Sequence, residues 1–370
     1  MGYLIEGRWT DEDPPETGQG GQFQRIDSAF HGRVTADGSS GFKAEAGRYH
    51  LYVGYHCPWA HRTLIYRALK GLEDAITVSY CLPAFRENGW TYEARPDYPD
   101  CSADEVNGFH YLWEAYAASD PGYTGKVTIP VLWDKQTRRI VNNESSEIIR
   151  MLNSEFSAVG AGDADYYPQD LRAEIDRLND LIYADVNNGV YRCGFARTQA
   201  AYEEAYAALF AALDQLEARL ADRRYLLGAR PTEADWRLFP TLVRFDVAYF
   251  SIFKCNRQQL RDFPNLWGYA RDLYATPKVA ATVKPRLYVQ NYYSLERVNP
   301  RGIIPEGTPV DFTAPHDRAR LGADDPRDGH DWLQDAAAGP AGRCVGPLLF
   351  PRSQGRRLKA TPGAHGRGGR

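Results

Sequence analysis

The sequence predicts two domains in one chain, an α/β domain followed by an all-α domain. A length of 370 residues exceeds one average domain, and 43% hydrophobic residues can supply two cores. Short apolar runs alternate with helical periodicity in the first half, whereas apolar residues recur only at helical spacing afterwards. We expect an irregular extension at 1–45, the α/β domain at 46–157, the helical domain at 158–312, and a disordered Gly/Pro/Arg-rich tail at 313–370.

Strands and helices are expected to alternate in the α/β domain. The strands are expected at 50–55, 75–80, 127–134 and 139–143. The helices are expected at 58–69, 105–117 and 147–152. Pro58 suits the first turn of its helix and Gly71 ends it, so the domain begins with a βαβ unit.

The helical domain is predicted from apolar residues that recur three and four positions apart. Its helices are expected at 171–186, 202–220, 236–251, 256–262 and 266–274. Thr232 is the expected N-cap of one helix, and Asp235 three residues later is its acidic partner. We therefore interpret this pair as a capping motif and not as a functional site.

Composition excludes several classes of protein. A net charge of −4 gives no reason to expect nucleic acid or an anionic membrane as a partner. No apolar run approaches the ~20 residues that span a bilayer, and the first residues lack the features of a signal peptide. Six scattered cysteines without CxxC or CxxH spacing argue against a disulfide framework and against a metal site. We expect a cytoplasmic protein.

Cys57 is the main candidate for chemistry, because it stands where a strand meets the N-terminus of a helix. Free N–H groups and the helix dipole favour a thiolate there, and the thiolate is the nucleophile. Ala60 replaces the second cysteine of a dithiol motif, so a small external thiol must complete the reaction. The alternative is a buried packing cysteine. His61 lies one helical turn further on, which disfavours a Cys/His protease pair.

Two further motifs fit a thioredoxin-like fold that binds an extended peptide such as glutathione. Ile129-Pro130 falls where that fold places a cis proline beside the active sulfur. Glu144-Ser145 stands at a helix start, where the serine and free N–H groups suit a carboxylate and the glutamate suits an ammonium. Each motif alone has an ordinary structural explanation. Together with Cys57 they predict a glutathione-dependent thiol transferase or reductase.

The chain resembles the glutathionyl-hydroquinone reductases, the Xi class of glutathione transferases. The resemblance covers about residues 20–312 and implies a thioredoxin-like domain plus an all-helical domain. It rests on motifs that occur together in that class: GRYHLY at 47–52, CPWAHRT at 57–63, GW at 89–90, YTGKVTIPVLW at 123–133, IVNNESSEIIR at 140–150, NNGVY at 187–191, TEADWRLF at 232–239, FKCN at 253–256 and NPRGI at 299–303.

The resemblance also implies a reaction and its residues. Cys57 would attack the sulfur of a glutathionyl-hydroquinone, and a second glutathione would resolve the mixed disulfide. The residues implied to hold glutathione are Trp90, Ile129, Pro130, Val131, Glu144 and Ser145. Those implied for the aromatic pocket, with tyrosine as proton donor, are Tyr191, Tyr292 and Tyr293. Glutathione is the implied co-substrate, without a metal, and the implied assembly is a homodimer.

The chain departs from the class around this aromatic pocket. Ile252, Gln290 and Leu295 stand where members usually carry histidines, so proton delivery must rest on Tyr, Lys, Arg or water. Two alternatives stay open. One is a thioltransferase or dehydroascorbate reductase that resembles the Omega class, which the long insert at 90–123 disfavours. The other is a non-catalytic binding protein with this fold, which the intact Cys57 disfavours.

Overall fold

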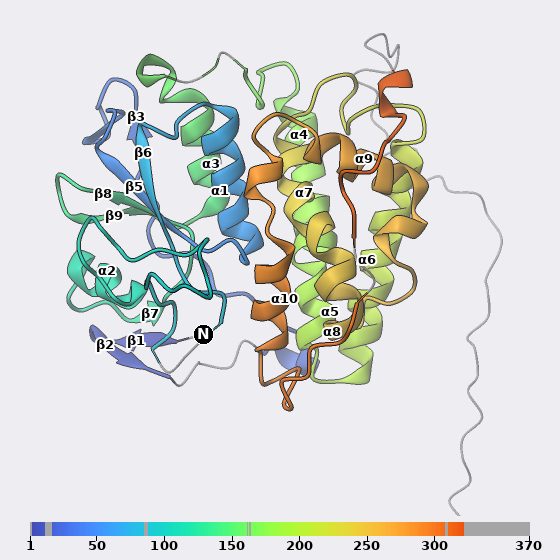
Figure 1. The fold of residues 1–370 in the computed structure, drawn as a ribbon, viewed down its shortest axis with the longest axis horizontal. Coiled ribbons are helices and arrows are strands. Elements are labelled where there is room, and N and C mark those ends of the chain that lie inside the picture. The colour runs from blue at the N-terminus through green and yellow to red at the C-terminus, as the bar shows by residue number, and fades with distance from the viewer. Residues whose placement is uncertain are drawn as a thin grey trace, which may run out of the picture. The chain divides into compact units, whose positions relative to one another are not determined.

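The computed structural model of the chain describes residues 2–11, 17–84, 88–160, 162, 164–307 and 310–321, and the findings below concern these residues. They form an α/β domain followed by a helical domain, which confirms the predicted fold class. Figure 1 shows helix α1 (Pro58–Leu69) between the sheet of the first domain and the helices of the second. In the described part of the chain, no helix is both long and apolar enough to cross a membrane.

A four-stranded sheet forms the centre of the α/β domain, in the order β6-β5-β8-β9. Its strands are β5 (Tyr49–Val53), β6 (Ile76–Tyr80), β8 (Val131–Asp134) and β9 (Arg139–Asn142). β5 runs parallel to β6 and antiparallel to β8, and β8 pairs antiparallel with β9. All of β5 is buried, because α1 and α3 (Ser145–Ser154) lie on the side facing the helical domain and α2 (Leu112–Ser119) on the other (Figure 1).

The N-terminal extension is more regular than the sequence predicts. It contains the strands β1 (Tyr3–Ile5), β2 (Arg8–Thr10), β3 (Val34–Thr35) and β4 (Phe42–Lys43). β1 also pairs with β7 (Gly125–Lys126), a partner that no local pattern reveals. Between these strands the extension contacts both domains. Thr198 donates a hydrogen bond to the carbonyl of Gly20 (2.7 Å), and the Phe30 N–H donates to the Asn143 side chain (2.9 Å).

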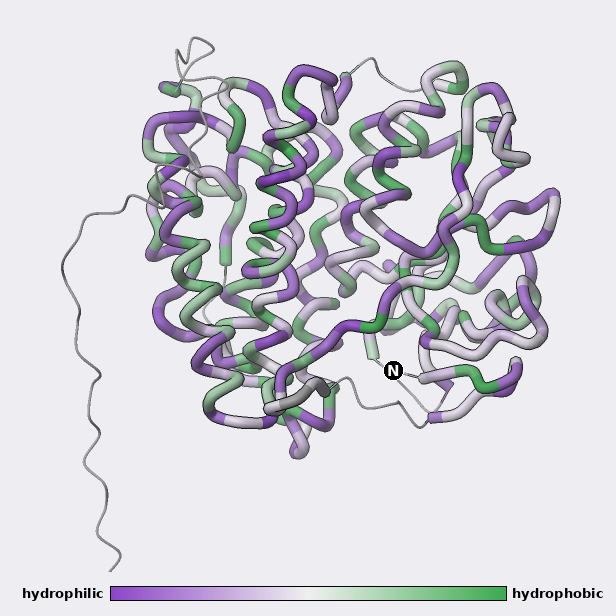
Figure 2. The backbone as a smooth tube through the Cα atoms, turned by 180° about the vertical axis from the view of Figure 1, so that it is seen from behind, coloured by the Kyte–Doolittle hydropathy of each residue, from purple (hydrophilic) through white to green (hydrophobic). Residues whose placement is uncertain are grey.

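The helical domain follows the predicted spacing with two additions. Its helices are α4 (Arg172–Leu181), α5 (Gly189–Phe195), α6 (Gln199–Arg219), α7 (Glu233–Arg244), α8 (Phe250–Ile252), α9 (Pro264–Tyr274) and α10 (Pro285–Tyr293). The sequence did not predict α5 and α10. Wide π turns at Ile182–Asn187 and Phe245–Tyr249 continue α4 and α7. Along the helices in Figure 2, hydrophobic and hydrophilic residues alternate, as in amphipathic helices with one buried face.

The capping interpretation of Thr232 and Asp235 is confirmed. Asp235 Oδ2 accepts hydrogen bonds from the Thr232 N–H (2.7 Å) and hydroxyl (2.9 Å). Asp235 Oδ1 accepts two more, from the Leu226 N–H and the Tyr269 hydroxyl. This buried carboxylate therefore organises the start of α7 and has a purely structural explanation.

Two predicted helices are shorter than expected. The helix predicted at 105–117 begins only at Leu112, because Asp104 accepts hydrogen bonds from the N–H groups of Val106 and Phe109 and holds that segment in turns. The helix predicted at 256–262 is reduced to a single 3₁₀ turn at Leu260–Asp262.

The tail was expected to be disordered from residue 313, but residues 310–321 pack against the helical domain. Arg318 is 1% exposed and donates hydrogen bonds to the carbonyls of Leu220 (2.6 Å) and Arg224 (2.8 Å). The Phe312 ring lies 5.2 Å from the Trp267 ring, measured between centroids. Arginine and aromatic side chains thus anchor a segment that was predicted to be disordered from its composition. The rest of the predicted tail, 322–370, lies outside the described residues.

Candidate active site

Cys57 is the N-cap residue of α1, directly before Pro58 in the first helical turn. Its Sγ lies 3.7 Å from the carbonyl oxygen of Ile129. The Ile129-Pro130 peptide bond is cis, so the predicted neighbourhood of sulfur and cis proline is present. Cys57 is partly exposed to an open cavity with about 700 Å³ of empty space. The thiol can therefore meet a ligand of moderate size.

The environment of the Cys57 thiol opposes ionisation more than the sequence predicts. Burial raises the pKa of the Cys57 thiol above its ordinary value. The N–H groups of Ala60 and Trp59 and the charges of Arg244 and Arg25 act in the other direction, but burial outweighs them. The helix N-terminus expected to stabilise the thiolate is thus present, and the surrounding protein reverses the net direction.

We expect the reactivity of Cys57 in the ligand-free protein to rise with pH to a midpoint above the ordinary pKa of a cysteine. Only the thiolate is alkylated, and burial holds the thiol protonated at neutral pH. The rate of modification by iodoacetamide, measured across a pH series, checks this. Cys57→Ser provides the background from the other cysteines. A midpoint below the ordinary value would show that the helix terminus, and not burial, dominates.

A buried arginine from α7 fixes the loop that leads to Cys57. Arg244 is 0% exposed and donates hydrogen bonds to the carbonyls of Tyr55 (2.6 Å) and His56 (3.0 Å). Its Nη1 also lies 3.0 Å from His61 Nδ1. The helical domain therefore positions the two residues that precede the sulfur. The same contact places His61 at the interface between the two domains.

The two histidines beside Cys57 are neutral. The His56 ring stacks on Trp90, with centroids 4.8 Å apart. Burial, aided by the Arg244 charge, lowers the pKa of His56 to about 3. Burial and the same charge also lower the pKa of His61 well below its ordinary value. Neither histidine holds a proton near neutral pH, so neither supplies the sulfur with a cationic imidazole.

A second cavity, with about 500 Å³ of empty space, lies next to the first and contains the predicted glutathione residues of α3. Glu144 is the N-cap of α3, and its Oε1 accepts a hydrogen bond from the Ser146 N–H (2.9 Å). Burial would raise the pKa of Glu144, but the hydrogen bonds from Ser146 and Ser28 and the charge of Arg62 outweigh it and lower this pKa. Glu144 is therefore a partly buried carboxylate that can receive an ammonium group.

The remaining predicted glutathione residues fall into two groups. Ile129 lines both cavities, Pro130 and Ser145 line the second, and Trp90 lines the first. Val131 is fully buried in β8 and lines neither cavity. In the part of the chain that the structure describes, no group of three or more His, Cys, Asp and Glu side chains is placed to hold a metal ion.

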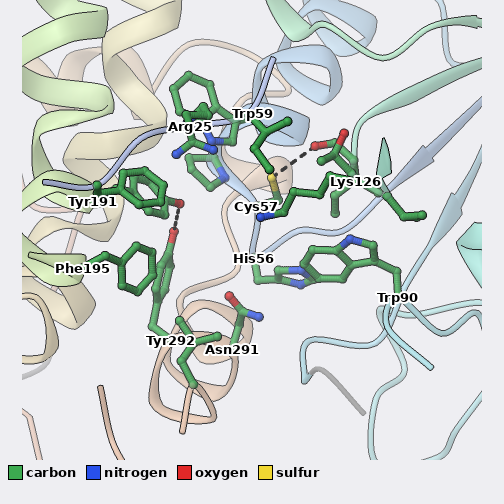
Figure 3. A pocket seen from close by; sticks show the side chains of 17 residues that line it. Arg25, His56, Cys57, Trp59, Trp90, Lys126, Tyr191, Phe195, Asn291 and Tyr292 are labelled. Carbon is green, nitrogen blue, oxygen red and sulfur yellow. Dashed lines mark hydrogen bonds between the residues drawn. The ribbon is translucent and has the colours of Figure 1, made fainter. Parts of the chain in front are cut away.

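Two of the three predicted tyrosines face Cys57 across the first cavity (Figure 3). The hydroxyls of Tyr191 and Tyr292 are hydrogen-bonded at 2.7 Å, and the Tyr292 hydroxyl is also 2.8 Å from that of Tyr249. Burial raises the pKa of Tyr191 and of Tyr292, so both phenols hold their protons. The prediction for Tyr293 is wrong in position, because its hydroxyl contacts Ser251 and it lines no part of this cavity.

Sequence reasoning missed several residues of this site, among them four that carry charge, an aromatic ring or a hydroxyl. Phe23 and Arg25 reach the cavity from the N-terminal extension, and Lys126 reaches it from β7. Tyr249 completes the hydroxyl chain from the π turn after α7. For Phe23 and Arg25 the only available signal was an aromatic and a basic residue inside the N-terminal lead-in, where no motif marks them.

An α/β domain with a cysteine at the N-terminus of α1 and a cis proline beside it, followed by a helical domain, is typical of glutathione transferases. The glutathione S-transferase N-terminal domain model matches residues 56–155, and the C-terminal domain model matches residues 199–272.

Individual relatives narrow the class. The glutathionyl-hydroquinone reductase PcpF of Sphingobium chlorophenolicum is 53% identical over 83% of this chain and 96% of its own. The glutathione-bound structure of YqjG from Escherichia coli matches with a TM-score of 0.79 and 46% identity, over 86% of this chain and 99% of that one. A Xi class structure from Natrialba magadii matches with a TM-score of 0.81 and 46% identity, over 87% and 98%. The chain belongs to the Xi class of glutathione transferases, the family of the glutathionyl-hydroquinone reductases.

Proposed function

We propose that the protein reduces glutathionyl-hydroquinones to hydroquinones, with glutathione as co-substrate. One observation supports this most strongly: the Cys57 thiol and the Tyr191–Tyr292 hydroxyl pair face each other across a single aromatic cavity. A nucleophilic sulfur and a proton donor on opposite sides suit a ligand whose C–S bond is cleaved between them. The 53% identical relative named for this activity points the same way.

The proposed reaction proceeds in two steps. The Cys57 thiolate attacks the sulfur that joins glutathione to the ring, and a Cys57–glutathione disulfide forms as the aryl C–S bond breaks. The ring carbon takes the electron pair and one proton, and the hydroquinone leaves. A free glutathione thiolate then attacks the disulfide, which yields glutathione disulfide and restores the Cys57 thiol. The ring gains two electrons, and two glutathione sulfurs lose one each.

The second cavity would hold the glutathione moiety. Glu144 offers a carboxylate to the γ-glutamyl ammonium, and Ser145 with the first N–H groups of α3 suits the neighbouring carboxylate. The Ile129 backbone beside cis-Pro130 can pair with the extended peptide, and Trp90 can cover it from the first cavity. For Val131, support comes only from the family resemblance and from its place in the strand after Pro130.

The proton for the ring carbon would come from the tyrosine hydroxyls. Tyr191 and Tyr292 are protonated at neutral pH, because burial raises the pKa of both phenols. Tyr249 lies behind Tyr292 and extends the chain of hydroxyls. The flanking histidines are neutral and cannot supply this proton, whereas the hydroxyl chain lies across the cavity from Cys57.

Incubation of the purified full chain with a glutathionyl-hydroquinone and glutathione tests the proposal. We expect hydroquinone and glutathione disulfide to appear in equal amounts over many turnovers, and release of hydroquinone beyond one equivalent per protein to require added glutathione. Both products are measured by chromatography over time. Turnover of dehydroascorbate or a small disulfide without cleavage of the aryl thioether would favour the Omega-like alternative. Binding without any turnover would favour the non-catalytic one.

We also propose that the protein is cytoplasmic and forms a homodimer. Five cysteines in the described residues are free thiols, which supports a reducing compartment. Support for the dimer comes from the family resemblance alone. Cell fractionation and light scattering of the purified full chain test these two statements, and a secreted or strictly monomeric protein would contradict them.

A further inference from the structure

Arg25 stands in the wall that the two cavities share, although it comes from the N-terminal extension. Its guanidinium carbon lies 4.7 Å from the centroid of the Trp59 ring and 4.8 Å from that of Tyr191. Figure 3 shows the side chain beside these rings, above the space that Cys57 faces. The extension is held to both domains on either side of this residue, so the guanidinium has a defined position.

The hydrogen bonds of Arg25 are incomplete in the described residues. Its Nε donates to the Asn188 side-chain oxygen at 3.1 Å. Its Nη2 is shielded from solvent and has no hydrogen-bond partner among the described residues. A buried donor without an acceptor is unfavourable, and more so when it is charged. A ligand oxygen in the cavity would supply the missing acceptor.

Arg25 places a positive charge in the wall of the first cavity. Arg25 and Lys126 are its charged side chains, His56 is neutral, and no Asp or Glu is among the described residues that line it. Aromatic side chains supply much of the remaining wall. A cavity of this kind is complementary to an aromatic ligand that carries negative charge. Glu144 and α3 already offer partners for the γ-glutamyl end of glutathione, which leaves the glycyl carboxylate and the ring as anionic partners for Arg25. Its position against the Trp59 and Tyr191 rings of the first cavity favours the ring.

We propose that Arg25 is a specificity-determining residue that pairs with an anionic oxygen on the aromatic part of the adduct. The protein then favours rings that bear a carboxylate or an ionised phenol over neutral rings. This inference rests on the proposed function for the identity of the adduct. It goes beyond that function by naming the charge of the preferred ring and the residue that selects it.

The test compares two glutathionyl-hydroquinones that are identical except for a ring carboxylate or its methyl ester. Their binding is measured by calorimetry in Cys57→Ser protein, so that turnover does not interfere. We expect the carboxylate adduct to bind about 10- to 100-fold more tightly than the ester, the range for a hydrogen bond to a charged group. Arg25→Gln should abolish this preference with little change for the ester. Arg25→Lys should keep part of it, because the charge remains but the planar donor is lost.

Arg33 offers a matched control on the same extension. Its side chain is 69% exposed and pairs with Glu155 outside both cavities, so Arg33→Gln should keep the full preference. A preference that survives in Arg25→Gln, or an equal loss for both adducts together with weaker binding of glutathione itself, would overturn the inference. The two proposals can fail separately. If Arg25→Gln loses the preference but the wild-type protein releases no hydroquinone, the result supports Arg25 as the ring selector and contradicts only the proposed reaction.

Discussion

Replacing Cys57 by serine is expected to lower the rate of hydroquinone release by a factor of about 10³ or more, the scale seen when a covalent nucleophile is removed. A serine hydroxyl cannot form a disulfide with glutathione, so the first step loses its product. Within the described part of the chain, no neighbouring thiol can substitute. Ala60 stands where a second cysteine would lie, and the other described cysteines, Cys81, Cys101, Cys193 and Cys255, are all buried.

The covalent intermediate gives this prediction a second measurement. Wild-type protein treated with a glutathionyl-hydroquinone in the absence of free glutathione should gain the mass of one glutathione, and Cys57→Ser should gain none. Cys193→Ser is the matched control, because Cys193 is 2% exposed and lies two residues from Tyr191. It should keep nearly the wild-type rate. Full activity in Cys57→Ser, or a glutathione adduct on another cysteine, would contradict the assignment.

The sequence predicted the sulfur side of the site because its signals are local. Cys57, Pro130 and Glu144 each stand at a junction between a strand and a helix or turn, and such junctions are marked by short patterns of residue types. The order of these junctions along the chain then specifies one fold. Periodicity likewise located most helices of the second domain, since each buries one face.

The opposite side of the site could not be predicted in this way. The helices α5 and α10 are short, and the sequence did not show them, so nothing indicated which way Tyr191, Tyr292 and Tyr293 point. Consecutive residues on a helix are about 100° apart, so the two members of a tandem pair point in different directions, and the sequence does not tell which one faces the cavity. The structure turns Tyr292 towards Cys57 and Tyr293 towards Ser251.

Long-range packing also explains the pKa of Cys57. The argument from a helix N-terminus considers only α1 and predicts a stabilised thiolate. Burial of the sulfur, which raises its pKa, arises from segments remote in sequence that close around it, among them the Ile129-Pro130 strand end and the extension that carries Phe23 and Arg25. Desolvation of this kind depends on the complete fold, and no sequence window contains it.

Removing the hydroxyl of Tyr292 should slow hydroquinone release by about 10²- to 10⁴-fold, the usual contribution of a positioned general acid. The Tyr292 hydroxyl joins Tyr191 to Tyr249, with contacts of 2.7 and 2.8 Å. Tyr292→Phe therefore removes one donor and leaves the hydroxyls of Tyr191 and Tyr249 without their shared partner. Delivery of a proton to the ring carbon fails whether Tyr191 or Tyr292 is the immediate donor.

Tyr293→Phe is a close control, because it removes the same group one residue further along α10, outside the cavity. It should leave hydroquinone release near the wild-type rate. Reduction of a small disulfide by glutathione needs Cys57 but no protonation of carbon, so Tyr292→Phe should leave that activity close to wild type. Equal losses in both tyrosine variants would indicate a structural effect of α10. If disulfide reduction and hydroquinone release fall equally in Tyr292→Phe, the hydroxyl chain stabilises the Cys57 thiolate and does not protonate the ring carbon.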